Sequence, residues 1–361
     1  MSVVSAFSAS YGEARAKFLD AVATTGGQAE TFVNPKAKGP EGEVLACDVV
    51  RFGPTDARRV LWLNSATHGA EGYCGSGAQI ALLADGVHKR LPADTALVIS
   101  HALNPYGFAW TRRVTEDNVD LNRNFFDHDR PHPKSDAYNE IHDLLIPADW
   151  DGPAREAAEA GIRDYIARNG AKAYQAAVTG GQYDQPTGVF YGGRAPSWSN
   201  IQIRDLARRH GAGAAEIIFL DFHTGLGPNG YGELIYGLTR DQSLVPWAQS
   251  LFDNEVTNPG DGSSTSAPVQ GTVVDGVAEE VPHARMLGIA IEYGTEPVPE
   301  VLDSLRGDHW LHVHGGRETE QGRAIVARVR RAFYSETDTW KEKIVARAQD
   351  VVNRALAGWS A

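Results

Sequence analysis

Cysteine is nearly absent from the sequence. Only Cys47 and Cys74 occur in 361 residues, and no C-x-x-C pair is present. Two isolated cysteines provide neither a disulfide framework nor a cysteine-rich zinc knuckle. We therefore expect a protein of a reducing compartment, with a cytoplasmic location.

Basic residues are also in deficit, with 34 Lys and Arg against 46 Asp and Glu and a formal net charge of −12. Such a surplus of negative charge repels phosphate backbones and anionic membrane surfaces at long range. No stretch reaches the roughly 18 apolar residues of a membrane span, and the N-terminal segment does not have the pattern of a secretory signal. We expect neither nucleic acid nor a membrane as a partner.

The G-x-S-x-G elbow of serine hydrolases is missing as well. The run "GYCGSG" follows a predicted turn at the start of a helical pattern, where small residues suit close packing. Cys74 lies in the same run and is equally poorly placed to act as a nucleophile. The sequence therefore does not predict covalent catalysis by serine or cysteine.

The rest of the composition, 42% hydrophobic and 22% charged, is typical of a globular protein with a large core. Residues 12–23 have an amphipathic helical pattern, and residues 44–52 and 59–64 are strand-like. Helical patterns recur at 200–210 and, with breaks, at 317–357. The alternation predicts an α/β fold with a mixed, mainly parallel sheet and helices on both faces.

Two segments, near 127–153 and 256–282, lack regular periodicity. The first is rich in His, Asp and Pro, and the second in Gly, Ser and Pro. Long irregular loops inside a compact domain are more often functional lids or rim insertions than linkers. We therefore expect one catalytic domain over residues 1–361, with irregular insertions at these two places.

Three apolar runs end in ionisable residues followed by glycine. The first leads to His68 and Glu71 in "HGAEG", the second to His223 in "DFHTG", and the third to Glu292 in "IEYGT". In open α/β sheets, ligands bind beyond the carboxyl ends of the strands, so these side chains can converge. Two imidazoles and one carboxylate are a common catalytic zinc set with one coordination position open. The pattern predicts one zinc ion per chain on His68, Glu71 and His223, with Glu292 accepting a proton from water.

The segment "NPYGFAWTRRVTEDNVDLNRNF", Asn104 to Phe125, extends this pattern. With it, the sequence resembles the zinc carboxypeptidase (M14-like) superfamily, in which an H-x-x-E pair, an N-P-x-G turn, an arginine, a D-x-N-R-N run, a distant histidine and a late glutamate follow in this order. More narrowly, "HGAEGYCGSG", "DFHTGLG" and "EYGTEP" resemble a bacterial branch, the DUF2817 group, over nearly the whole chain.

The resemblance implies the same metal ligands and makes Glu292 the general base and later proton donor. It also implies that Asp120 hydrogen-bonds His68 and fixes its tautomer, the usual role of a carboxylate behind a metal-bound imidazole. Asn122 and Arg123 match the carboxylate-binding pair of the family.

The arginine that polarises the scissile carbonyl is matched by Arg113 or by its neighbour Arg112. The spacing from Arg113 to Asn122 is shorter than in digestive carboxypeptidases, which leaves both candidates open. We favour Arg113.

The digestive enzymes carry a mobile tyrosine roughly twenty residues before the catalytic glutamate, but no tyrosine lies between Gly237 and Ile291. This difference favours the succinylglutamate desuccinylase and aspartoacylase relatives, which hydrolyse amides of small N-acyl amino acids. We therefore expect a zinc-dependent amide hydrolase that acts on a small carboxylate-bearing N-acyl amino acid or short peptide. A true metallocarboxypeptidase and a non-catalytic metal- or ligand-binding relative remain the alternatives.

Overall fold

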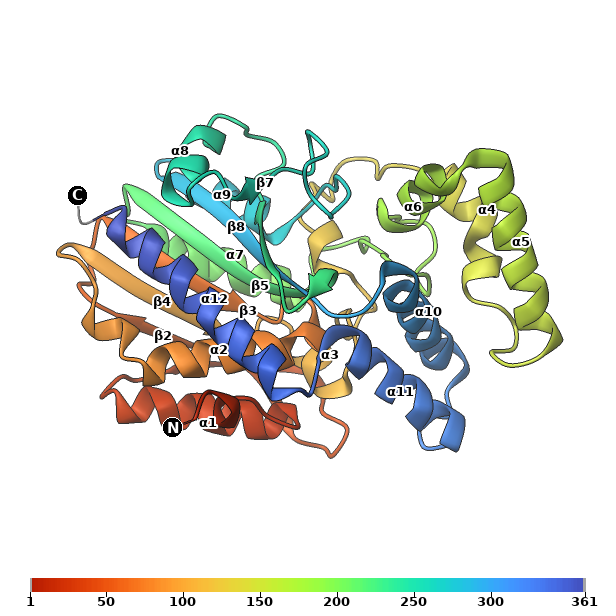
Figure 1. Cartoon of the computed structure of the whole chain (residues 1–361), viewed down its shortest axis with the longest axis horizontal. Helices are drawn as coiled ribbons and strands as arrows, with labels where there is room; N and C mark the ends of the chain where they lie inside the picture. The colour runs from red at the N-terminus through yellow and green to blue at the C-terminus, as the bar shows by residue number, and fades with distance from the viewer. Residues whose placement is uncertain (1, 360–361) are drawn as a thin grey trace.

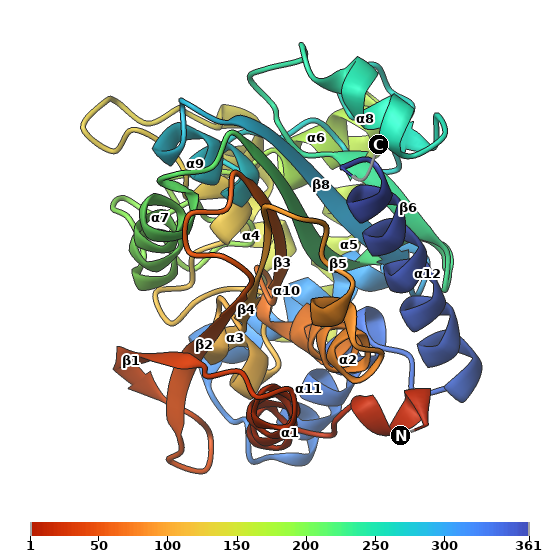
Figure 2. The same cartoon turned by 90° about the vertical axis from the view of Figure 1, so that its left-hand side faces the viewer.

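The computed structural model describes residues 2–359, which form an eight-stranded sheet in the order β1-β2-β4-β3-β5-β8-β6-β7 (Figure 2). The strands are β1 Glu30–Lys38, β2 Val44–Phe52, β3 Arg59–Ser65, β4 Thr95–His101, β5 Glu216–Asn229, β6 Gly232–Tyr236, β7 Val256–Thr257 and β8 Arg285–Gly294. The central strands β4, β3, β5 and β8 are parallel, whereas β1–β2, β2–β4 and β6–β8 pair antiparallel. The predicted mixed, mainly parallel sheet is confirmed.

Helices cover both faces of the sheet, and Figure 2 shows α1, α2 and α12 on one side and α7 and α9 on the other. Their bounds are α1 Tyr11–Thr24, α2 Gly72–Ala84, α7 Trp198–Gly211, α9 Val273–Glu280 and α12 Asp338–Ala357. Because both faces are covered, all seven residues of β4 are buried, and such strands read as continuous apolar runs. A Cβ on Gly75 of α2 would lie 2.7 Å from the Cβ of Ser65, so the small residues of "GYCGSG" allow close packing.

A second group of helices lies beside one end of the sheet (Figure 1). It comprises α4 Asp136–Leu145, α5 Pro153–Asn169, α6 Ala171–Thr179, α10 Val298–His314 and α11 Glu320–Phe333. The remaining helices are α3 Pro105–Trp110 and α8 Val245–Leu251, with 3₁₀ helices η1 Val3–Ala6, η2 Gly69–Glu71, η3 Val87–Lys89 and η4 Leu121–Arg123. Within residues 2–359, no helix combines the length and apolar character that a membrane span requires.

The two segments that the sequence predicts to be irregular both contain a helix, so that prediction was wrong in part. In the first, Tyr138, Ile141 and Leu145 are buried along one face of α4, a spacing of three and four residues. In the second, the Thr272 side chain accepts a hydrogen bond from the Asp275 backbone N–H and caps α9. Both helices are short, so their patterns are masked by the polar loops around them.

Candidate active site

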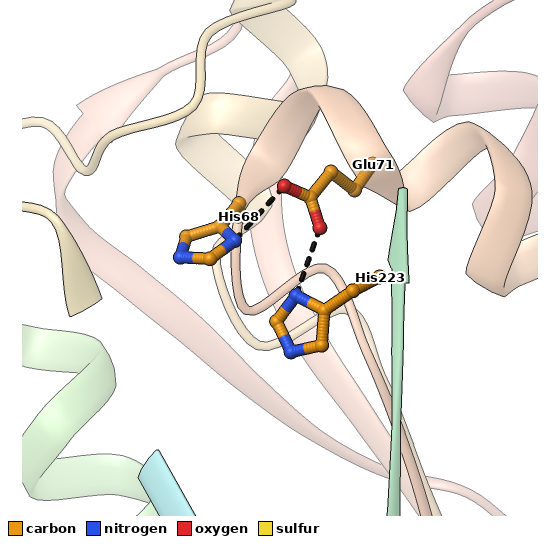
Figure 3. Close-up of side chains that lie close together, drawn as sticks. All are labelled: His68, Glu71 and His223. Carbon is orange, nitrogen blue, oxygen red and sulfur yellow. Dashed lines mark hydrogen bonds and ion pairs between the residues drawn. The ribbon is translucent and has the colours of Figure 1, made fainter. Parts of the chain in front are cut away.

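His68, Glu71 and His223 converge (Figure 3) just beyond the carboxyl end of β3, where the neighbouring strand β5 continues past it. His68 follows β3 and directly precedes η2, which contains Glu71, while His223 lies in β5, the neighbour of β3. One ligand atom of each residue lies within 4.8 Å of the others, and all three side chains are buried. Parallel pairing of β3 and β5 therefore joins residues that are far apart in sequence.

The turn that presents His68 and Glu71 is held against the segment that follows α3. Gly69 N–H donates to the Arg113 carbonyl at 3.0 Å, and Ala70 N–H donates to the Arg112 carbonyl at 2.8 Å. A Cβ on Gly69 would lie 1.9 Å from the carbonyl carbon of Gly107. Only glycine therefore permits this close approach of η2 to α3.

Both imidazoles turn Nδ1 toward Glu71 (Figure 3). The Nδ1 atoms of His68 and His223 lie 2.9 Å from Oε1 and Oε2 of Glu71, respectively. On the other side of each ring, His68 Nε2 lies 3.3 Å from Asp120 Oδ1, and His223 Nε2 lies 2.7 Å from Asp221 Oδ2. A carboxylate behind an imidazole holds the proton on Nε2 and leaves the Nδ1 lone pair for a cation. The donor set therefore fits a divalent metal ion.

Asp221 is a residue of the site that was not predicted from the sequence. Its carboxylate is buried and also accepts hydrogen bonds from Thr67 Oγ1 and Asn64 Nδ2, each at 2.8 Å. The available signal was the run "DFH" in a predicted strand, because residues two apart in a strand share one face. The Asp221 carboxylate therefore contacts Nε2 of His223 in the same way as the Asp120 carboxylate contacts Nε2 of His68.

We expect Asp221→Asn to weaken metal binding by about 10- to 100-fold, because an amide does not hold the Nε2 proton of His223 as a carboxylate does. The dissociation constant for Zn²⁺ can be measured by competition with a chromogenic chelator. Asp48→Asn, which changes a buried carboxylate on β2 paired with Arg15, should leave that constant unchanged. Wild-type affinity in a folded Asp221→Asn protein would contradict the assigned role.

The charges of the cluster stabilise one another. Burial by itself would raise the pKa of Glu71, but the His68 charge and the contacts with both imidazoles hold this pKa below its usual range. Burial opposes the charge of His223, yet Asp221 and Glu71 raise its pKa well above the ordinary value. Burial likewise disfavours the Asp120 carboxylate, but Arg113 keeps its pKa well below the usual range. Glu71 is therefore ionised and able to bind a cation.

Glu292 lies beside this cluster on β8. It is paired with His223 in the parallel β5–β8 ladder, so both side chains point to the same face of the sheet. The Leu226 backbone N–H donates to Glu292 Oε1 at 3.0 Å. Burial and the charge of Glu71 raise the pKa of Glu292 to about 7. A carboxyl group with a near-neutral pKa can both accept and return a proton.

The side chains of the two adjacent arginines, Arg112 and Arg113, point in different directions. Arg113 lines the cavity and donates from Nε to Asp120 Oδ2 at 2.8 Å and from Nη1 to Glu71 Oε1 at 3.1 Å. Arg112 turns toward α10, where its Nε lies 2.9 Å from Asp308 Oδ2, and only 3% of its surface is exposed. Arg113 therefore lines the cavity, whereas Arg112 does not.

The predicted substrate-binding residues line the same cavity, which has a volume of about 530 Å³. Arg123 ends η4 and donates from Nη1 to the Asn122 carbonyl at 2.9 Å. Asn122 Oδ1 accepts a hydrogen bond of 2.9 Å from the Val273 backbone N–H at the start of α9. The structure thus brings seven of the eight predicted residues to the cavity, with Asp120 behind them: His68, Glu71, Arg113, Asn122, Arg123, His223 and Glu292.

Comparison with known families assigns the chain to one of them. The model of the family described as "Protein of unknown function (DUF2817)" matches residues 7–347. The chain belongs to the DUF2817 family, which confirms that part of the resemblance. None of the curated proteins searched matches the chain.

Several solved structures resemble this one at low sequence identity. The carboxypeptidase A of Helicoverpa armigera is 16% identical, with 90% of this chain and 73% of that chain covered and a TM-score of 0.47. A candidate metallopeptidase of Shewanella amazonensis is 11% identical, with coverages of 84% and 92% and a TM-score of 0.43. The succinylglutamate desuccinylase of Chromobacterium violaceum is 15% identical, with coverages of 87% and 72% and a TM-score of 0.35.

Proposed function

We propose that the protein is a zinc-dependent hydrolase that cleaves an amide bond in a small, carboxylate-bearing N-acyl amino acid or short peptide. The observation that carries the proposal is the convergence of the His68, Glu71 and His223 donors with the Glu292 carboxyl in one cavity. A zinc ion bound there would polarise the amide carbonyl and lower the pKa of a water molecule toward neutrality.

Glu292 is the proposed general base. Its carboxylate takes a proton from the attacking water and returns a proton to the departing nitrogen, as its near-neutral pKa permits. The hydrogen bond from the Leu226 backbone N–H holds Oε1, which leaves Oε2 for the proton.

Arg113 is the proposed group that stabilises negative charge on the amide oxygen. Its Nη2 lies 2.8 Å from His68 Nε2, while the Nε contact with Asp120 holds the guanidinium in place. In the tautomer of His68 that binds a cation through Nδ1, Nε2 carries a proton and cannot accept from Arg113. The Nη2 group is then available to a substrate oxygen.

Arg123, with Asn122, is the proposed binding site for the substrate carboxylate. Burial lowers the pKa of Arg123, because the cation has lost most of its hydration. A carboxylate would supply both the missing charge and a planar acceptor for the guanidinium. This arrangement supports a substrate with a free carboxylate.

Catalysis by Cys74 is not supported. The thiol is fully buried in α2, and burial together with the Glu71 charge raises its pKa well above the ordinary value. A thiol that stays protonated and out of contact with solvent is a poor nucleophile. Metal-assisted hydrolysis is therefore the mechanism that the site supports.

Metal analysis of the purified, never-chelated protein tests the proposal. We expect about one zinc per chain, and we expect hydrolysis of N-acyl amino acids to disappear after chelation and to return with added Zn²⁺. A folded protein without stoichiometric metal, or hydrolysis that is unchanged by complete removal of the metal, would contradict it.

A further inference from the structure

Three arginines and three acidic residues line the cavity, and two of the arginines already form ion pairs. Arg113 pairs with Asp120 and Glu71, and Arg240 pairs with Glu279 at the rim. Among residues 2–359, no Asp or Glu oxygen lies within 4.0 Å of a side-chain nitrogen of Arg123. Arg123 is therefore a buried cation without a direct ion pair, and among the acidic residues only the more distant Asp120 carboxylate favours its charge, which leaves Arg123 able to bind one substrate carboxylate.

Ala290 and Ile235 form an apolar floor beside Glu292. Both line the cavity, and they are paired in the antiparallel β6–β8 ladder. Ala290 lies two residues before Glu292, so the three side chains point to one face of the sheet. A two-residue step in a strand is roughly 7 Å, which places this floor about one side chain's length from the proposed base.

Val274 of α9 closes the far end of this floor. It covers Gly288, the next position of β8 on the same face, where a Cβ would lie 2.0 Å from Val274 Cγ1. Helix α9 begins at Val273, which is hydrogen-bonded to Asn122 beside Arg123. A substrate side chain next to a carboxylate that is bound by Arg123 therefore contacts the alkyl groups of this floor and of Val274.

Strand β8, which carries Glu292, lies between β6 and β5, so β5 is on the other side of Glu292 from Ile235. A second apolar wall lies on this side, where α10 and α11 contact β5 (Figure 1). Val301, Leu305 and Phe333 line the cavity and belong to one core cluster. A Cβ on Gly225 in β5 would lie 3.2 Å from Phe333 Cε1 and 3.7 Å from Val301 Cγ1. These side chains are uncharged, so this side of the cavity also suits an apolar group.

We infer that the substrate carries a single carboxylate and an apolar group on each side of the scissile amide. This inference rests on the proposed function and names its substrate class: N-acyl amino acids with an aliphatic acyl group and an aliphatic or aromatic side chain. A second carboxylate, whether on the acyl group or on the side chain, would be buried against one of the apolar walls without a cation.

Matched pairs of substrates test the inference with the metal-loaded enzyme. N-butyryl-leucine is compared with N-succinyl-leucine, which adds a carboxylate to the acyl group, and with N-butyryl-aspartate, which adds one to the side chain. We expect kcat/KM to be at least about 100-fold higher for N-butyryl-leucine in both pairs, because a buried, unpaired charge is strongly disfavoured.

The outcomes distinguish failure of the inferred substrate class from failure of the proposed function. Equal or higher kcat/KM for either dicarboxylic substrate would overturn the inference and leave the hydrolase in place. Hydrolysis of none of the three by protein that contains its metal would contradict the proposed function and the inference together.

A variant of the floor tests the subsite itself. Ala290→Leu should lower kcat/KM for N-butyryl-leucine by at least about tenfold relative to N-butyryl-glycine, at unchanged metal content, because the added side chain occupies the space above the floor. Ala23→Leu, an exposed position on α1, should not change that ratio. An equal loss for both substrates would show that the leucine side chain does not bind over Ala290.

Discussion

Replacing Glu292 by glutamine is expected to lower kcat for amide hydrolysis by about 10²- to 10⁴-fold, the usual contribution of a general base, while the metal content stays that of the wild type. Glutamine has the same shape, and its Oε1 can still accept the hydrogen bond from the Leu226 backbone N–H. It cannot take a proton from water. Steady-state kinetics together with elemental analysis would measure both quantities.

Glu216→Gln is the matched control for this variant. Glu216 lies at the amino end of β5, where it contacts Arg285 and Trp359, and His223 of the active site lies seven residues further along the strand. We expect this variant to retain wild-type kcat. If Glu292→Gln kept more than about a tenth of wild-type kcat, the base would have to be another group.

The pKa of Glu292 predicts how kcat/KM depends on pH on the acid side of the profile. Burial and Glu71 disfavour the ionised form of Glu292 and raise its pKa from 4.5 to about 7 without a cation, whereas a metal ion on the neighbouring ligands favours that form. Because the base must be ionised, kcat/KM should rise with pH, with a midpoint between 4.5 and about 7. A profile that is flat from about pH 4 to 8 would contradict this role.

Replacing His223 by alanine is expected to lower the rate of hydrolysis about as strongly as Glu292→Gln does, because it removes a ligand of the metal ion. Loss of a carboxylate that hydrogen-bonds a metal ligand lowers metal affinity by about 10- to 100-fold. Loss of a direct ligand should therefore lower metal affinity by more than roughly 100-fold. His223→Ala should therefore emerge from gel filtration without metal and without hydrolase activity. The readouts are metal per chain, the Zn²⁺ dissociation constant and the rate of hydrolysis.

The alanine variant leaves Glu71 and Asp221 without the imidazole that lies between them, so its folding needs a check. His223→Asn keeps a polar side chain at the position and serves as a second variant, with unfolding followed by circular dichroism. His314→Ala, at an exposed position near the end of α10, is the control. One tightly bound zinc in either folded His223 variant would place the metal elsewhere.

The metal-ligand candidates could be recognised from the sequence because their pattern is local. His68 and Glu71 lie three residues apart after an apolar run, and His223 and Glu292 each end another such run. Buried parallel strands require such runs, and their carboxyl ends meet at one edge of the sheet. The alternation of runs and helical patterns therefore predicted both the sheet and the place where these residues converge.

Helix α4 and the role of Asp221 were not predicted, for different reasons. The buried face of α4 has only three apolar residues within a polar segment, which is too few for a clear helical period. Asp221 became recognisable only when its carboxylate was seen to accept from Thr67 and Asn64 and to meet His223.

The residue types and their periodicity within single segments were enough to predict the buried strands and to name the candidate ligands and base. The directions of neighbouring side chains, in contrast, depend on the tertiary structure. Arg112 and Arg113 are chemically identical in sequence, and they differ because Asp308 of α10 pairs with Arg112, whereas Asp120 pairs with Arg113 beside the cavity. Contacts with distant segments set the direction of a side chain in a loop, and no local sequence pattern records these contacts.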